Sequence, residues 1–151
     1  MHRLATVGYE GASVGDFLDA LQRAKIDLLV DVRAVAMSRR PGFAKTALAA
    51  NLRDAGIDYL HLRRLGTPAD GRAAARSGDH ATMRRIFLAH LATEGAQEEL
   101  ASLADLVQSD KRVCILCFEA DPAHCHRRLV ATALQNTMPL EVVDLFPGES
   151  S

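Results

Sequence analysis

The segment IDLLVDVR, residues 26–33, is the strongest indicator of the fold, because its apolar residues lead directly into a charged end. A nearly unbroken apolar run of this length is typical of a strand covered on both faces of a parallel sheet. The segment VCILCF, residues 113–118, has the same character and is followed by Glu119. We therefore interpret both segments as central strands with polar residues at their carboxyl ends.

Strand-like and helix-like segments alternate on either side of these two runs. This alternation predicts one three-layer α/β domain, with a mostly parallel five-stranded sheet and helices on both faces. Right-handed crossovers leave few strand orders, and the Rossmann-like order 3-2-1-4-5 is expected. The expected strands cover residues 3–7, 26–32, 57–62, 113–118 and 140–146; the expected helices cover 45–56, 81–93, 96–109 and 125–136, with another beginning at the N-cap Ser13.

The length of 151 residues fits a single domain, expected over residues 1–147, with a frayed tail at 148–151. No apolar run approaches the roughly 20 residues that span a bilayer, and the first residues lack the pattern of a signal peptide. A cytoplasmic protein without a membrane partner is therefore expected. In that compartment Cys114, Cys117 and Cys125 are expected to be reduced thiols.

The loops that follow the strands carry much of the positive charge. Residues 8–12, 33–45, 62–80 and 119–128 hold ten of the 18 Lys and Arg but five of the 19 Asp and Glu. The whole chain has a net charge of −1, so these loops form a positive edge on a near-neutral protein. Such an edge favours an anionic small molecule or nucleic acid as partner, unless its arginines are ordinary surface charges.

Polar residues at the ends of separate strands are the candidates for one site. The carboxyl ends of parallel strands meet at one edge of a sheet, where such folds bind ligands. Asp31 and Glu119 are candidate bases, although either could equally hold an arginine in place. His61 is a candidate for proton transfer. The expected substrate-binding residues are Tyr9, Glu10, Arg33, Ser38, Arg39 and Arg127.

The segment CFEADPAHCHRR, residues 117–128, is the most specific feature. Cys125 falls near the first turn of a helix, where the helix dipole and the following arginines favour a thiolate. His126 could move protons near neutral pH. Cys125 is therefore a candidate nucleophile. The alternatives are a non-covalent phosphate site at the same helix N-terminus and a plain buried cysteine.

Two familiar cysteine motifs are excluded by their spacing. Cys114 and Cys117 are three residues apart on a strand, so they point to opposite faces and cannot chelate together. An arginine six positions after the cysteine, as a phosphatase phosphate loop requires, is missing after Cys117 and after Cys125. The sequence therefore favours neither a dithiol redox motif nor a phosphatase loop.

A divalent metal site remains as an alternative for the same segment. Cys117, Cys125 and His126 supply the soft and borderline ligands that such an ion prefers. His124 and His126 are two residues apart, and on a helix this spacing places their side chains about 200° apart around the axis. Both could therefore bind one ion only from a non-helical loop. No organic cofactor is expected.

Four groups of residues occur in order along nearly the whole chain. They are Val7-Gly8-Tyr9-Glu10-Gly11; Leu29-Val30-Asp31-Val32-Arg33 with Ser38-Arg39-Arg40; Tyr59-Leu60-His61-Leu62 before Leu65-Gly66; and Leu116-Cys117-Phe118-Glu119 with Cys125-His126-Arg127. This set resembles the family of the domain of unknown function 488. The resemblance implies a compact α/β domain with these motifs at one site, and it implies no particular reaction. One departure is Ala36, where such sequences usually place a proline in the second loop.

These observations predict an enzyme, a hydrolase or transferase, that acts on a phosphate-bearing substrate such as a nucleotide or nucleic acid. A non-catalytic module that binds a nucleotide or nucleic acid is the first alternative. The aromatic content of the chain is only 5%, which leaves few side chains on which the bases of a single strand could stack. This counts against recognition of single-stranded nucleic acid. A metal-dependent enzyme or sensor is the second alternative. The sequence leaves the oligomeric state open and allows a homodimer.

Overall fold

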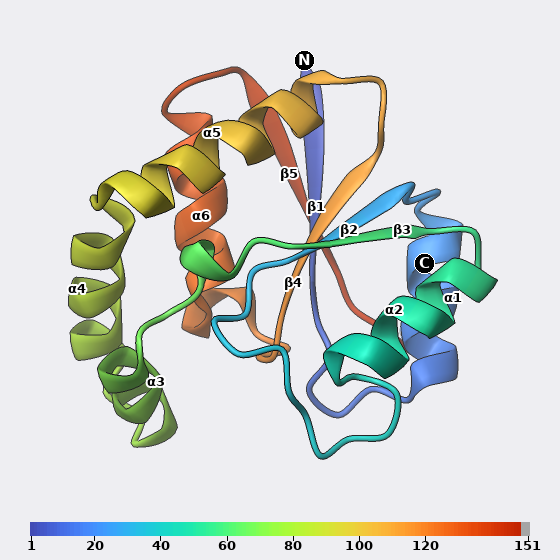
Figure 1. The fold of residues 1–151 in the computed structure, drawn as a ribbon, viewed down its shortest axis with the longest axis horizontal. Coiled ribbons are helices and arrows are strands. Elements are labelled where there is room, and N and C mark those ends of the chain that lie inside the picture. Colours follow the sequence, from blue (N-terminus) through green and yellow to red (C-terminus); the bar gives the residue numbers. More distant parts are fainter. Residues whose placement is uncertain (149–151) are drawn as a thin grey trace.

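Five parallel strands form the central sheet of the computed structural model, which describes residues 1–148 (Figure 1). This arrangement confirms the predicted α/β class with a parallel sheet. The predicted frayed tail lies outside the described residues, apart from Gly148. The strands are β1 (His2–Gly8), β2 (Leu28–Asp31), β3 (Asp58–His61), β4 (Val113–Cys117) and β5 (Leu140–Leu145). The helices are α1 (Val14–Arg23), α2 (Lys45–Asp54), α3 (Ala69–Arg76), α4 (His80–Leu91), α5 (Glu94–Gln108) and α6 (His126–Gln135), with short 3-10 helices η1 (Arg63–Leu65) and η2 (Pro122–His124).

The strand order is β3-β2-β4-β1-β5, so the predicted order was wrong in exchanging β1 and β4. Both strands are apolar and buried along most of their length, so the pattern of burial does not distinguish them. With right-handed crossovers, the predicted and the observed strand orders also place each connecting helix on the same face of the sheet. The position of the helices therefore does not distinguish the two orders. The observed order puts β4 between β2 and β1, with Gly8 opposite Cys117 and Asp31 opposite Leu116. The end of β4 is therefore the centre of the carboxyl edge.

Helices cover both faces of the sheet, as predicted. Helices α1 and α2 lie on one face, and α5 and α6 lie on the other (Figure 1). The core under α1 and α2 includes Cys114, whereas the core under α5 and α6 includes Cys117 and Cys125. The sequence-based conclusion that Cys114 and Cys117 face opposite sides is thereby confirmed. No helix in residues 1–148 has the length and apolarity needed to cross a membrane.

Local signals placed most helix ends correctly. Ser13 is the N-cap of α1, and its hydroxyl accepts a hydrogen bond from the Asp16 backbone N–H at 3.1 Å. Gly56 follows α2 with a φ of 78°, the left-handed conformation that glycine favours after a helix. Helix α3 was not predicted, because Gly66, Pro68 and Gly71 made its surroundings resemble a loop. It stands with α4 at one side of the molecule (Figure 1).

Close backbone contacts bring the loops of the carboxyl edge together. A Cβ atom at Gly8 would lie 1.7 Å from the carbonyl oxygen of Glu119. A Cβ atom at Gly66 would lie 2.1 Å from the backbone nitrogen of Ala34. Glycine at these positions allows the loop after β4 to cross the end of β1, and η1 to pack on the loop after β2.

Candidate functional site

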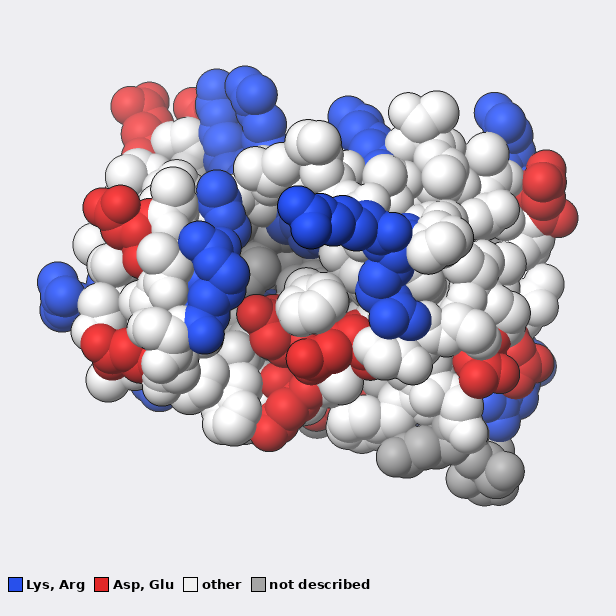
Figure 2. Space-filling view, turned by 90° about the horizontal axis from the view of Figure 1, so that it is seen from below, with Lys and Arg blue, Asp and Glu red and all other residues white. Residues whose placement is uncertain are grey.

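A cavity of about 400 Å³ opens at the carboxyl edge, where β1, β2 and β4 end. Figure 2 looks onto this edge and shows Lys and Arg side chains beside the hollow, with Asp and Glu gathered along another side. The walls come from the loops after β1 and β2, from α3 and α4, and from the segment after β4. Six of the residues predicted from the sequence line this cavity: Tyr9, Arg33, Ser38, Cys117, Glu119 and His126.

Arg33 is buried at the end of β2 and is neutralised by Asp31. Its Nε and Nη2 donate to the two carboxylate oxygens of Asp31 at 2.9 and 2.7 Å. Its Nη1 donates to the hydroxyl of Tyr9 at 3.2 Å and to the carbonyl of Phe43 at 2.8 Å. Burial by itself lowers the pKa of Arg33, but the hydrogen bonds and charge of Asp31 outweigh it and raise the pKa. Little of this guanidinium is free to bind a ligand.

Tyr59 completes this buried pair from the neighbouring strand β3. Its hydroxyl donates to the Asp31 carboxylate at 2.6 Å. Burial raises the pKa of Tyr59, and the hydrogen bond to Asp31 raises it further. His61 lies on the same strand, and its Nε2 is 2.6 Å from the carbonyl oxygen of Arg33. Asp31 and His61 therefore position Arg33 and do not line the cavity.

Arg127 is fully buried in the first turn of α6, and its partners are neutral oxygens and a sulfur. Its Nε donates to the Thr6 hydroxyl at 3.2 Å, and its Nη2 donates to the Ala120 carbonyl at 3.1 Å. Its Nη1 donates to the Glu119 carbonyl and to the sulfur of Cys117, the latter at 3.2 Å. No ion pair to Arg127 is found in residues 1–148. Burial lowers the pKa of this guanidinium.

Cys117 and Cys125 form a disulfide that joins the end of β4 to the start of α6. The expectation of three reduced thiols is therefore wrong for this pair and holds for Cys114. Cys125 is the N-cap of α6, where its sulfur accepts a hydrogen bond from the backbone N–H of Arg127 at 3.4 Å. Burial raises the pKa of the Cys114 thiol on the opposite face of the sheet. Cys117 lines the cavity, whereas Cys125 lies behind it.

His126 is buried beside the two sulfurs with a defined orientation. Its Nε2 is 2.7 Å from the carbonyl oxygen of Val32, and its Nδ1 is 3.8 Å from the sulfur of Cys125. Burial lowers the pKa of His126 to about 4, so the ring is neutral at pH 7. A ring nitrogen of His126 and the sulfurs of Cys117 and Cys125 lie within 4.8 Å of one another. These three residues, named from the sequence, form the group within residues 1–148 that could hold a metal ion.

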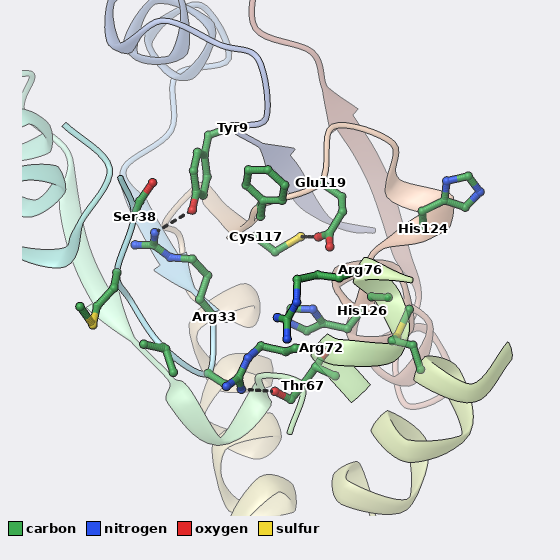
Figure 3. A pocket seen from close by; sticks show the side chains of 16 residues that line it. Tyr9, Arg33, Ser38, Thr67, Arg72, Arg76, Cys117, Glu119, His124 and His126 are labelled. Atoms are coloured by element: carbon green, nitrogen blue, oxygen red, sulfur yellow. Dashed lines mark hydrogen bonds between the residues drawn. The ribbon is translucent and has the colours of Figure 1, made fainter. Parts of the chain in front are cut away.

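Glu119 lies at the cavity wall next to the sulfur pair. Its Oε2 is 3.7 Å from the sulfur of Cys117, and the two side chains point toward one another (Figure 3). Burial raises the pKa of Glu119, which suits a general acid. Glu10 is exposed and accepts a hydrogen bond from the Ala120 backbone N–H at 3.1 Å. Glu10 therefore holds the loop after β4 and does not line the cavity.

Arg72 and Arg76 are cavity residues that the sequence reasoning did not name. They are one turn apart on α3, and both guanidinium groups extend into the cavity (Figure 3). Arg72 donates from Nη1 to the Thr67 carbonyl at 2.9 Å. Neither arginine forms an ion pair within residues 1–148. The four-residue spacing in RAAAR was an available signal, but it was assigned to a loop.

The remaining predicted residues lie at the margin of the site. The Ser38 hydroxyl accepts a hydrogen bond from the Arg40 backbone N–H at 3.1 Å, within the loop that contains Ala36. Arg39 is exposed and does not line the cavity. The predicted convergence of four separate loops on one edge is confirmed, but the cavity takes its free arginines from α3.

Comparison with known proteins agrees with the motifs noted in the sequence. The model of the family described as domain of unknown function DUF488 matches residues 13–134. The chain belongs to this family. The DUF488 match contains Arg33, Cys117, Cys125 and His126, whereas Tyr9 precedes it. No curated protein and no solved structure matches the chain.

Proposed function

We propose that this DUF488 domain is an enzyme that acts on a small phosphate-bearing substrate, held in the cavity by Arg72 and Arg76. The observation that carries the proposal is the pair of guanidinium groups that face one cavity without an ion-pair partner in residues 1–148. Paired arginines suit phosphate because each presents a planar fork of N–H donors.

The surrounding charges favour an anion at this place. Arg33 keeps its charge balanced by Asp31, so it contributes shape and hydrogen bonds but little net attraction. Arg72 and Arg76 are not balanced in this way. Low-dielectric walls around a cavity strengthen the field that such unbalanced charges produce.

The size and lining of the cavity favour a small molecule over a polymer. Its volume of about 400 Å³ falls in the range typical of small-molecule sites. Val35, Met37 and Phe118 line it and are 48%, 76% and 43% exposed, so an apolar surface borders the charged end. A nucleotide-sized phosphate ester would place its phosphate near α3 and its organic part on these side chains.

The groups beside the arginines support chemistry in addition to binding. Glu119 faces the cavity with a pKa raised by burial, so it is the proposed general acid–base residue. Asp31 and His61 are proposed as positioning residues, because they hold Arg33 from behind the cavity wall. Cys125, the candidate nucleophile from the sequence, keeps that role as a prediction, and Cys117 is the sulfur at the cavity wall.

Binding of inorganic phosphate and AMP, measured by titration calorimetry, tests the arginine pair. The double variant Arg72→Ala/Arg76→Ala should bind both at least about tenfold more weakly, since hydrogen bonds to charged groups contribute about 1.5–3 kcal/mol each. The control is Arg84→Ala/Arg85→Ala, which removes two exposed arginines of α4 that do not line the cavity. Equal affinity in the two double variants would reject this anion site.

Turnover separates an enzyme from a binding module. A panel of phosphate esters, screened by release of inorganic phosphate, should include substrates of the wild type. Glu119→Gln should lower turnover of these by about 100-fold or more while leaving AMP binding within about threefold, because positioned acid–base groups contribute about 10²–10⁴-fold to rate. Phosphate binding without turnover of any ester would support the non-catalytic alternative.

A further inference from the structure

The buried sulfur pair and His126 have the composition of a transition-metal centre. Two thiolates and one imidazole are a known ligand set for a zinc ion that keeps its fourth position open. The Nδ1 of His126 is 3.8 Å from the sulfur of Cys125. A tetrahedral zinc ion with ordinary bond lengths requires about 3.6 Å between these atoms. The imidazole is therefore already near the required position.

Val32 fixes which nitrogen of His126 faces the sulfurs. The carbonyl oxygen of Val32 can only accept a hydrogen bond, so the Nε2 that lies 2.7 Å from it carries the ring proton. The lone pair of the neutral ring is then on Nδ1, on the side of Cys125. A backbone carbonyl in this position is the usual outer partner of a metal-binding histidine.

Two features of α6 would stabilise negative charge on these sulfurs in the reduced protein. The sulfur of Cys117 accepts a hydrogen bond from the guanidinium of Arg127 at 3.2 Å. The sulfur of Cys125 caps the N-terminus of α6 and accepts from a backbone N–H at 3.4 Å. A fully buried arginine is costly unless negative charge lies close to it. Arg127 forms no ion pair within residues 1–148, and the carboxylate charge that acts on it most is the more distant Asp144. Two thiolates at the positions of Cys117 and Cys125 would place negative charge closer to this guanidinium.

The open side of this cluster faces the cavity. Cys117 and His126 line the cavity, whereas Cys125 closes the cluster from behind. Glu119 borders the same opening, with its Oε2 at 3.7 Å from the sulfur of Cys117. A fourth ligand to an ion held here, water or a substrate oxygen, would therefore enter from the cavity.

We propose that Cys117, Cys125 and His126, in the reduced protein, bind one zinc-type transition-metal ion whose fourth coordination position opens into the cavity. The charges balance, because a divalent ion and Arg127 offset the two thiolates and the Glu119 carboxylate. The proposal goes beyond the phosphate-directed function, since the ion is held by Cys117, Cys125 and His126 and not by Arg72 or Arg76. A metal ion bound by these three residues would act as a Lewis acid or activate a water molecule at the proposed site.

The disulfide has to be reduced before the ion can bind. A dithiol breaks the Cys117–Cys125 bond by thiol–disulfide exchange: it loses two electrons and becomes a cyclic disulfide, and its two protons pass to the protein sulfurs. Binding of Zn²⁺ then displaces those two protons into solvent. The sulfurs separate to about 3.8 Å, the distance between two ligands of a tetrahedral zinc ion. Oxidised protein should therefore bind no zinc at this place.

Metal content after reduction tests the proposal directly. Protein purified without a metal-affinity tag is reduced with a dithiol, loaded with Zn²⁺, desalted without oxygen and analysed for zinc per chain. Wild type should hold one equivalent, and Cys117→Ser, Cys125→Ser and His126→Gln should each bind zinc at least about 100-fold more weakly, more than loss of an outer partner costs. Cys114→Ser is the matched control, because Cys114 is on the same strand but on its opposite face.

A spectrum of the wild type keeps the test decisive if a variant fails to fold. Co²⁺ in place of Zn²⁺ should show thiolate charge-transfer bands and the intense visible bands of tetrahedral cobalt. Absence of zinc and of these bands in reduced, folded wild type would overturn the proposal, as would equal zinc in Cys114→Ser and Cys117→Ser. Because zinc is counted without any phosphate ligand, this result is independent of the calorimetry on Arg72 and Arg76.

Discussion

Arg33 and Arg127 are both buried at the carboxyl edge, but their surroundings differ in one respect. Arg33 faces the carboxylate of Asp31, which takes two of its N–H groups. Arg127 has no carboxylate partner in residues 1–148 and donates to neutral oxygens and to the sulfur of Cys117. The first arginine closes a charge pair. The second leaves a positive charge next to a pair of cysteines.

This difference shows that an arginine near a functional site is not necessarily a ligand for the substrate. Both residues were predicted from the sequence to bind substrate, and both have most of their donors occupied by the protein. The arginines free to meet an anion, Arg72 and Arg76, are on a helix outside the motifs. A buried arginine whose N–H groups are already hydrogen-bonded within the protein therefore has a structural role. An arginine that faces a cavity with unpaired N–H groups is the better candidate for binding a ligand.

The largest effect is expected when the ion pair between Arg33 and Asp31 is broken. Arg33→Met should lower the free energy of unfolding by about 3–5 kcal/mol, because the fully buried Asp31 carboxylate loses its counter-charge. The double variant Asp31→Asn/Arg33→Met should recover part of this loss, since it removes the stranded charge. Urea unfolding followed by circular dichroism measures both. If the double variant is no more stable than Arg33→Met, the unpaired charge of Asp31 is not the cause of the lost stability.

Arg127→Met provides the contrast for that experiment. This variant should lose stability because the oxygen atoms that accept hydrogen bonds from Arg127 are left without a donor. Each buried acceptor left unpaired should lower the free energy of unfolding by about 1–3 kcal/mol. Asp144 is the carboxylate whose charge most raises the pKa of Arg127, but it accepts a hydrogen bond from the Thr6 hydroxyl at 2.5 Å and forms its ion pair with Arg128 at 3.5 Å. Asp144→Asn should therefore not rescue Arg127→Met. A rescue as large as the one expected at Asp31 would remove the distinction between the two arginines.

A smaller effect tests the close packing around Arg127. In Gly8→Ala the new methyl group would meet the carbonyl oxygen of Glu119 at 1.7 Å and Nη1 of Arg127 at 2.9 Å. Forced backbone shifts of this kind cost about 1–3 kcal/mol of stability, measured by thermal or urea unfolding. Gly15→Ala on α1 is the control, because nothing lies within 4 Å of its added methyl group. It should be neutral or stabilising by up to about 1 kcal/mol.

The smallest expected effect sharpens the description of the Arg33 pair. Tyr59→Phe removes the hydrogen bond to Asp31 and should cost about 0.5–1.5 kcal/mol at pH 8. The folded protein raises the pKa of Tyr59 above its ordinary value of 10.0, so the folded state holds this proton more tightly than the unfolded state. Wild type should therefore lose stability relative to Tyr59→Phe as the pH rises above 10. A stability difference that stays constant from pH 8 to pH 11 would contradict the raised pKa.

Much of the fold followed from contiguous stretches of sequence. Periodicity and caps placed the strands and most of the helices, as Ser13 and Gly56 illustrate. The opposite orientation of Cys114 and Cys117 followed from the two-residue period of a strand. Helix α3 was missed, because the glycines and proline around it favour a loop while its packing against α4 favours a helix. Its cavity arginines were missed with it.

A parallel α/β sheet with the motif residues collected at one edge was predictable from the sequence, because these features depend on patterns within short segments and on the common direction of the strands. Three features became known only from the folded chain: β4 lies between β2 and β1, Cys117 meets Cys125, and Arg33 is neutralised while Arg72 and Arg76 form no ion pair within residues 1–148. These features depend on pairings between residues that are far apart in the sequence. Buried apolar strands such as β1 and β4 are interchangeable by composition, and an arginine's partners become known only when the loops that surround it are placed.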